Sequence, residues 1–129
     1  MKFADVEEGK VYPERTFTFR EEEIKAYLEA VEDDTTLYVG QKLVPPAFAA
    51  VFARWEALAD EPLPEGTVHA KQGFRYLKPL HWGDTVTLRG FVKSKMEKKG
   101  LKFIERQVEV YDAADDLAVV SEIKIILPE

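Results

Sequence analysis

The chain has 129 residues, of which 46% are hydrophobic and 33% are charged, with no cysteine and a formal net charge of −6. This length and composition are typical of a single domain spanning residues 1–129, and they exclude disulfides, thiolate zinc sites and thiol catalysis. The acidic balance disfavours nonspecific binding to nucleic acid or anionic membranes, because both require clustered lysine and arginine.

Residues 1–14 are expected to form an irregular lead-in, since Gly9 and Pro13 interrupt any regular element. This segment lacks the apolar core of a signal peptide, so we expect a cytoplasmic protein. The longest uncharged apolar run, residues 44–53, is far shorter than the ~20 residues that a membrane span requires.

A short strand is predicted at Arg15–Phe19, followed by a helix that ends near Glu32. Thr18 and Glu21 have the spacing of a capping box, in which the two side chains satisfy the first free amides of a helix. Three glutamates, at 21–23, favour the first helical turn because the helix dipole stabilises negative charge there.

A second helix is predicted from Ala47 to Leu58, opened by Pro45 and Pro46. Proline is tolerated at the first helical positions because those amides have no intrahelical partner. Apolar residues occupy nearly every side of this segment, which indicates a helix buried on most of its circumference. The proline-rich stretch 61–66 ends it.

The C-terminal half reads as four strands, at residues 67–77, 85–95, 101–111 and 117–127, joined by short turns. The basic run 93–99 is expected to be a solvated hairpin tip. A long apolar helix needs a curved antiparallel sheet to wrap it, so this order predicts an α+β hot-dog fold. Its edge strands need protection, which favours dimerisation edge to edge.

Three segments of the chain together resemble the MaoC-like hydratase/dehydratase family over most of residues 15–127. They are Ala30 to Tyr38, Val44 to Ala49, and Phe74 to Thr85. The order and spacing of the three segments are more specific than any one of them. The resemblance is to the branch of N-terminal or stand-alone dehydratase-like domains that lack the catalytic histidine.

Active members of that family carry Gly-Asp-x-Asn-Pro-x-His, whose aspartate and histidine orient a water across an enoyl-thioester double bond. The resemblance places Asp33 on the aspartate and Tyr38 on the histidine. Hydration requires a base near neutral pH, and a phenol with a pKa of about 10 is a poorer base than an imidazole at about 6.5. The substitution therefore favours a substrate-binding or weakly active subunit over an independent hydratase.

The family also places the thioester carbonyl at the start of the central helix, where free amides stabilise developing negative charge. Pro45 and Pro46 cannot donate, so the resemblance implies the amides of Ala47, Phe48 and Ala49. Side chains of the same helix give a second expectation. Those of Phe48, Phe52 and Trp55 either line an acyl tunnel or fill the core between helix and sheet.

The two histidines lead to different expectations. His69 opens the stretch 69–74, where members of this branch often carry a histidine, and it is either a catalytic residue near a dimer interface or a hydrogen-bonded strand-end residue. His81 lies in a turn and is expected to be exposed. The pair Asp33 and Asp34 has no third ligand nearby in sequence, so no metal site is predicted.

The leading hypothesis is an acyl-thioester-binding protein related to (R)-specific enoyl-CoA hydratases and 3-hydroxyacyl dehydratases, without a cofactor. Its ligand would be an acyl-CoA or an acyl-carrier thioester, and its partner a second hot-dog chain in a homodimer or heterodimer. An acyl-CoA thioesterase is the alternative, with Glu56 or Asp60 as the carboxylate, although both lie late in the predicted helix. A noncatalytic acyl-binding or scaffold protein is the third.

Overall fold

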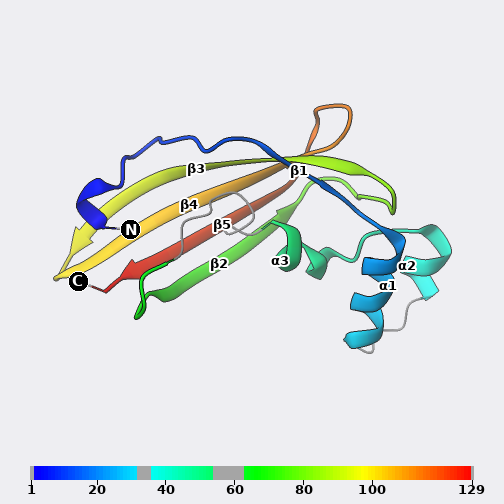
Figure 1. Cartoon of the computed structure of the whole chain (residues 1–129), viewed down its shortest axis with the longest axis horizontal. Coiled ribbons are helices and arrows are strands. Elements are labelled where there is room, and N and C mark those ends of the chain that lie inside the picture. Colours follow the sequence, from blue (N-terminus) through cyan, green and yellow to red (C-terminus); the bar gives the residue numbers. More distant parts are fainter. Residues whose placement is uncertain (1, 32–35, 54–62, 129) are drawn as a thin grey trace.

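The alternating sequences of the C-terminal half form most of one antiparallel sheet (Figure 1). The computed structural model describes residues 2–31, 36–53 and 63–128. Its five strands lie in the order β1-β3-β4-β5-β2. They are β1 (Arg15–Thr18), β2 (Val68–Tyr76), β3 (Thr85–Lys98), β4 (Leu101–Tyr111) and β5 (Leu117–Leu127).

The helical segments among the described residues are short and precede the long strands in the sequence. They are η1 (Phe3–Asp5), α1 (Glu21–Ala30), α2 (Thr36–Gln41), η2 (Pro46–Phe48) and α3 (Ala49–Phe52). Figure 1 shows α1, α2 and α3 near the end of the sheet where β2 ends and β3 begins. Helices set apart from an antiparallel sheet define an α+β architecture, which confirms the predicted class.

The turn between β3 and β4 consists of Lys99 and Gly100, which have φ angles of 53° and 79°. In a two-residue hairpin, a turn whose two central residues both have positive φ has the twist that matches that of the flanking strands. Lys98 and Lys99 are exposed beside this turn, in agreement with the predicted solvated tip. Strand β3 continues three residues past its predicted end at Lys95, because the tight turn keeps the two strands in register.

The two faces of the sheet differ in polarity. Alternate residues of β3, β4 and β5 are buried on one side, called here the core face, which includes Leu88, Ile104, Val108 and Ile125. The opposite side, called the outer face, carries charged residues, among them Glu105 paired across the strands with Lys124. Because successive side chains of a strand point to opposite faces, this alternation decides which side buries the core.

An aromatic cluster joins the helical segments to the sheet. Phe19 and Phe52 are almost fully buried, with ring centroids 4.9 Å apart in an edge-on arrangement. Phe17 stacks on Phe52 at 5.6 Å, and Tyr27 of α1 contacts Phe48 at 5.0 Å. Such pairs contribute about 0.5–1.5 kcal/mol each beyond the area they bury. The cluster therefore holds the η2–α3 segment against the sheet.

The predicted capping box is wrong. Thr18 is the last residue of β1, and its hydroxyl lies 2.8 Å from that of Thr85, its partner in β3. Helix α1 begins at Glu21 after Arg20, which makes no side-chain cap. Pairing between strands has overridden a local helix-start signal, because the hydroxyl is already engaged across the sheet.

The long apolar central helix predicted from Ala47 to Leu58 is not confirmed. A 3-10 turn precedes α3, which spans four residues, and Ala53 leaves the helical region with φ −92° and ψ 45°. Proline at the start favours the tighter turn, whose Phe48 amide donates to the Pro45 carbonyl at 2.9 Å. The rest of the predicted helix lies in residues 54–62, outside the described residues.

The N-terminal lead-in is held to the edge of the sheet by backbone hydrogen bonds. The Gly9 amide donates to the Val92 carbonyl at 2.8 Å, and the Tyr12 amide donates to the Gly90 carbonyl at 2.9 Å. Residues 9–12 therefore follow the edge of β3 beyond the end of β1. In the part of the chain that the structure describes, no helix has the length and apolarity needed to cross a membrane.

Candidate functional site

The segment that leads into η2 is held against the β2–β3 connection by backbone hydrogen bonds. The Val44 amide donates to the Leu80 carbonyl, and the Trp82 amide donates to the Lys42 carbonyl, both at 2.8 Å. The Trp82 indole also donates to the Leu43 carbonyl at 2.8 Å. These contacts join two segments far apart in sequence and thereby place the two prolines that follow Val44 beside the end of β2.

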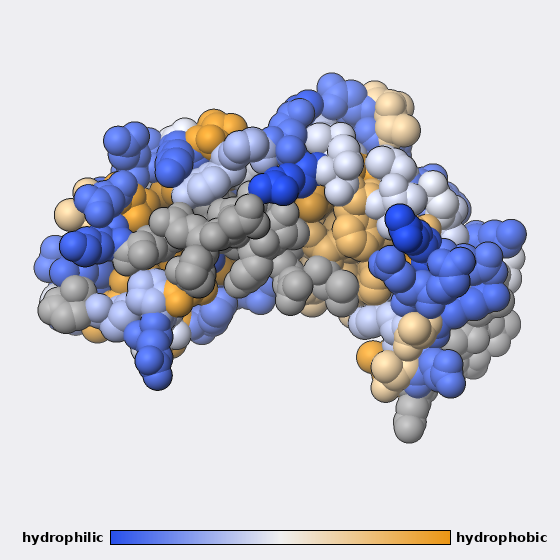
Figure 2. All heavy atoms as spheres, in the orientation of Figure 1, coloured by the Kyte–Doolittle hydropathy of each residue, from blue (hydrophilic) through white to orange (hydrophobic). Residues whose placement is uncertain are grey.

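A pocket of about 390 Å³ lies between these joined segments. Apolar side chains dominate its lining, and Figure 2 shows apolar surface between the sheet and the helices at the right of the view. Its lining comprises Tyr38, Leu43, Val44, Pro45, Pro46, Ala49, Phe52, Tyr76, Leu77, Lys78, Pro79, Leu80 and Val119. A mostly apolar cavity of this size with a few polar groups is typical of small-molecule sites.

Tyr76 closes one side of the pocket. Its hydroxyl donates a hydrogen bond to the Pro46 carbonyl oxygen at 2.7 Å, and its ring stacks on Phe74 with centroids 6.2 Å apart. Burial, with a smaller contribution from Tyr27, raises the pKa of the Tyr76 phenol above its ordinary value. The phenol therefore remains a hydrogen-bond donor at neutral pH and fixes the distance between β2 and η2.

Three of the residues selected from the sequence meet in this pocket. Tyr38 is half-buried on α2, and Ala49 and Phe52 come from α3. Asp33 and Trp55 belong to residues 32–35 and 54–62, outside the described residues. The structure therefore brings together the tyrosine and part of the predicted acyl-binding helix, while the pairing of Asp33 with Tyr38 stays a prediction.

Phe48 lies apart from the pocket lining. It is 3% exposed and contacts Tyr27 and Phe17 within the aromatic cluster. This placement matches the expectation that it fills the core. Phe52 belongs to the aromatic cluster and also lines the pocket.

The three predicted amides differ in availability. Phe48 donates to the Pro45 carbonyl, and Ala49 donates back into the turn to the carbonyls of Pro46 and Ala47. Among the described residues, Ala47 is the member of the set whose amide has no acceptor. A four-residue helix also supplies a smaller dipole than the long helix predicted, because the macrodipole sums aligned peptide units.

Neither histidine lines this pocket. His69 is exposed on β2 opposite Ile125, whereas Tyr76 at the far end of the same strand lines the pocket. The strand between these two residues spans roughly 23 Å, since each residue advances about 3.3 Å. His81 is exposed in its turn, as predicted, where its amide donates to the Asp84 carboxylate at 2.9 Å.

Lys78 is the charged side chain among the described lining residues of the pocket. Its ammonium forms ion pairs with Asp112 and, at 3.4 Å, with Asp116. A hydrogen bond from Lys78 holds the pKa of the Asp112 carboxyl below its usual range, and Asp112 in turn raises the pKa of Lys78. These contacts tie the end of β2 to the hairpin between β4 and β5.

Sequence reasoning missed Tyr76, Lys78 and Val119 as pocket residues. The family resemblance of the stretch from Phe74 to Thr85 indicates that this segment is important for function. It does not assign a role to any one side chain of the segment. Val119 lies on the core face of β5, and that face continues into the pocket. Tertiary contact with the 43–52 segment distinguishes these residues from their neighbours.

Comparisons with known proteins agree with this architecture. The family model described as "FAS1-like, dehydratase domain region" matches residues 8–121. A UPF0336 protein of Cutibacterium acnes is 36% identical over 95 residues, which cover 67% of each chain.

Two solved structures show the same fold. The C-terminally truncated HadBC (3R)-hydroxyacyl-ACP dehydratase complex of Mycobacterium tuberculosis superposes with a TM-score of 0.75 at 18% identity, covering 92% of this chain and 96% of that one. The (R)-hydratase of A. caviae involved in PHA biosynthesis has a TM-score of 0.64 at 20% identity, and the match covers 96% of this chain and 98% of that chain. The hot-dog fold predicted from the sequence is therefore confirmed. The chain belongs to the FAS1-like dehydratase-region family, whose model matches residues 8–121.

Proposed function

We propose that this chain binds an acyl thioester and acts as the substrate-binding or weakly active subunit of a hydratase/dehydratase pair. The observation that carries the proposal is the apolar pocket of about 390 Å³ lined by Tyr38, Tyr76 and Phe52. Its apolar wall suits an acyl chain, and its polar groups suit a thioester carbonyl near Tyr38. In this proposal the partner supplies the aspartate and histidine that activate water.

The second supporting observation is the chemistry of Tyr38. A phenol donates a hydrogen bond well but accepts a proton poorly near neutral pH. Tyr38 can therefore orient a carbonyl or a water, and Asp33 would have to act as the base if this chain were active alone. The (3R)-hydroxyacyl-ACP dehydratase HadBC is a complex, which supports a divided arrangement by analogy of fold.

His69 has a place in the same proposal. Two β2 strands paired antiparallel along their free edges bring the start of one strand beside the end of the other. A partner's residue at the position of His69 would then lie near the end of this chain's β2, where Tyr76 lines the pocket. We propose that the pocket is completed in this way by the second hot-dog chain.

Binding is tested by isothermal titration of the purified chain with crotonyl-CoA and with free coenzyme A. The proposal expects heat of binding for the acyl form that Val119→Phe abolishes, because the larger ring fills the pocket. Val11→Phe is the matched control, since the same exchange occurs at a residue that is 71% exposed in the lead-in. Equal binding by both variants and the original chain would contradict the pocket assignment.

Activity is tested by following loss of the enoyl absorbance of crotonyl-CoA and, separately, release of free thiol. The proposal expects little turnover of either kind by the chain alone. Rapid hydration that Asp33→Asn abolishes would overturn the subunit role and identify an independent hydratase. Thiol release would instead favour a thioesterase.

A further inference from the structure

The two borders of the sheet are unlike each other. Strand β1 has four residues, follows Pro13, and shares its border with residues 9–12 of the lead-in. Strand β2 has nine residues, and β5 is its one neighbour among the described strands. A long edge strand without proline presents a row of backbone donors and acceptors that can pair with another chain. The β2 border is therefore the open one.

The open border is basic in an otherwise acidic chain. Lys71 and Arg75 are exposed on β2, and residues 67–78 contain no aspartate or glutamate, although the chain has a net charge of −6. Both residues lie on the outer face, because their cross-strand partners are Lys124 and Val120. Within the described residues, neither has a carboxylate at ion-pair distance.

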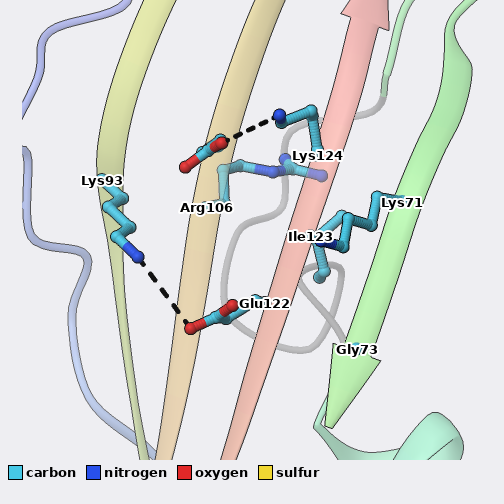
Figure 3. A pocket seen from close by; sticks show the side chains of 8 residues that line it. Lys71, Gly73, Lys93, Arg106, Glu122, Ile123 and Lys124 are labelled. Atoms are coloured by element: carbon cyan, nitrogen blue, oxygen red, sulfur yellow. Dashed lines mark ion pairs between the residues drawn. The ribbon is translucent and has the colours of Figure 1, made fainter.

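The nearest glutamates of the outer face are already engaged. Glu122 lies 3.9 Å from the ammonium of Lys93, and Glu105 lies 3.1 Å from that of Lys124 (Figure 3). Figure 3 shows Lys71 beyond these pairs, on the strand at the border of the sheet. The side chain of Lys71 extends from β2 toward Ile123 in Figure 3, and its positive charge is paired with neither of these glutamates.

Pairing of β2 with a second copy of itself would bring these charges together. In a two-fold antiparallel pair centred on Gly73, Lys71 of each chain lies opposite Arg75 of the other. A shift of two residues places only one of the two, Lys71 or Arg75, opposite Gly73 of the other chain and leaves like charges as diagonal neighbours at about 7–8 Å. Like charges at such positions destabilise a strand pair.

Gly73 adds a place for an opposite charge. A hollow of about 80 Å³ lies beside it, with Lys71, Lys93 and Lys124 among its lining residues (Figure 3). No described atom lies within 4 Å of a Cβ added at Gly73. An acidic side chain from a strand paired with the free edge of β2 would have room there, and its carboxylate would meet Lys71.

We infer that the β2 border selects a second hot-dog chain whose edge strand carries aspartate or glutamate opposite Lys71 and Arg75, and disfavours a second copy of this chain. The inference rests on the proposed function, because it names the partner that the divided site requires. Two similar chains could then assemble as a heterodimer through charge complementarity and like-charge repulsion together.

The experiment uses a charge-reversed copy of the chain, Lys71→Glu with Arg75→Glu, as a surrogate acidic partner. Sedimentation velocity compares each protein alone with their equimolar mixture, without any acyl thioester. We expect the mixture to associate about tenfold more tightly than either protein alone, with the difference reduced at high salt. Circular dichroism first confirms that the variant is folded.

The matched control reverses two exposed lysines at the hairpin tip, Lys98→Glu with Lys99→Glu, and should not associate more tightly with the original chain. A mixture that associates no more tightly than the original chain alone, including one that stays monomeric, overturns the inference. Because no ligand is present, that result leaves the titration with crotonyl-CoA as an independent measure of the proposed function.

Discussion

The Tyr76 hydroxyl donates a hydrogen bond to the Pro46 carbonyl oxygen 2.7 Å away, which joins the end of β2 to the start of η2. These residues are 30 positions apart in the sequence, and both line the pocket. The contact links the sheet, which carries most of the core, to the short helices that carry Tyr38 and Phe52. This hydrogen bond therefore helps to fix the shape of the pocket, together with the one from the Trp82 indole to the Leu43 carbonyl.

Tyr76→Phe should lower the free energy of unfolding by about 0.5–1.5 kcal/mol, the net contribution of a typical hydrogen bond. It should also weaken binding of crotonyl-CoA, because η2 loses its tie to β2. Urea denaturation and isothermal titration measure the two effects. Tyr111→Phe is the control, since its hydroxyl binds Glu109 away from the pocket. Equal loss of crotonyl-CoA affinity in both variants would rule out a local role for Tyr76.

Phe52→Ala should lower the free energy of unfolding by about 3–5 kcal/mol, because it removes a buried ring and leaves a cavity. Denaturant unfolding followed by fluorescence measures the change. Phe103→Ala, at a half-buried position on the outer face, should cost less. Similar losses for the two variants would argue against the aromatic cluster as the main contact between helices and sheet.

Asp112→Asn should reduce thermal stability most between about pH 5 and 9. The folded pKa of Asp112 is lowered, so its contribution is present above the ordinary carboxyl pKa and is lost as the pH falls through the lowered value. The folded pKa of Lys78 is raised, so its contribution is lost only as the pH rises through that value. The melting temperatures of Asp112→Asn and of the original chain should therefore become equal in acid.

The control for this ion pair is Asp5→Asn, which removes a carboxylate from the exposed lead-in. Its effect should be small at every pH. A difference between Asp112→Asn and the original chain that persists undiminished in acid would show that the carboxylate charge is not the cause.

Gly40→Ala and Gly100→Ala should have opposite effects on stability. Gly40 is exposed in α2, and alanine there should stabilise the chain by about 0.5–1 kcal/mol through helix propensity. Gly100 has φ +79° in the hairpin turn, and alanine there should cost about 1–2 kcal/mol because L side chains are strained at positive φ. Thermal melts compare the variants, and a stabilised Gly100→Ala would contradict the turn geometry.

Strand prediction succeeded where the pattern was long and local. The predicted ranges 101–111 and 117–127 coincide with β4 and β5, because alternation over eleven residues has one arrangement that buries the apolar side. Prediction failed where a local signal competed with pairing. Thr18 has capping-box spacing, yet its hydroxyl meets Thr85 across the sheet.

The candidate site was predicted less completely than the fold. Tyr38, Ala49 and Phe52 were selected from the sequence and line the pocket. Tyr76 and Lys78 were not selected, because nothing local distinguishes a strand tyrosine or lysine that meets a distant loop from one that faces solvent. Their roles follow from contacts with η2 and with the β4–β5 hairpin.

The amino-acid sequence by itself determined the strand alternation, the hairpin turns, the absence of cysteine chemistry and the tyrosine at position 38. These properties depend on residue type and short-range spacing. Only the tertiary structure decided where the pocket lies, which amides of the η2 turn are engaged, and that the β2 border is open and basic. Those properties depend on which distant segments meet, and that is set by burial of the whole core.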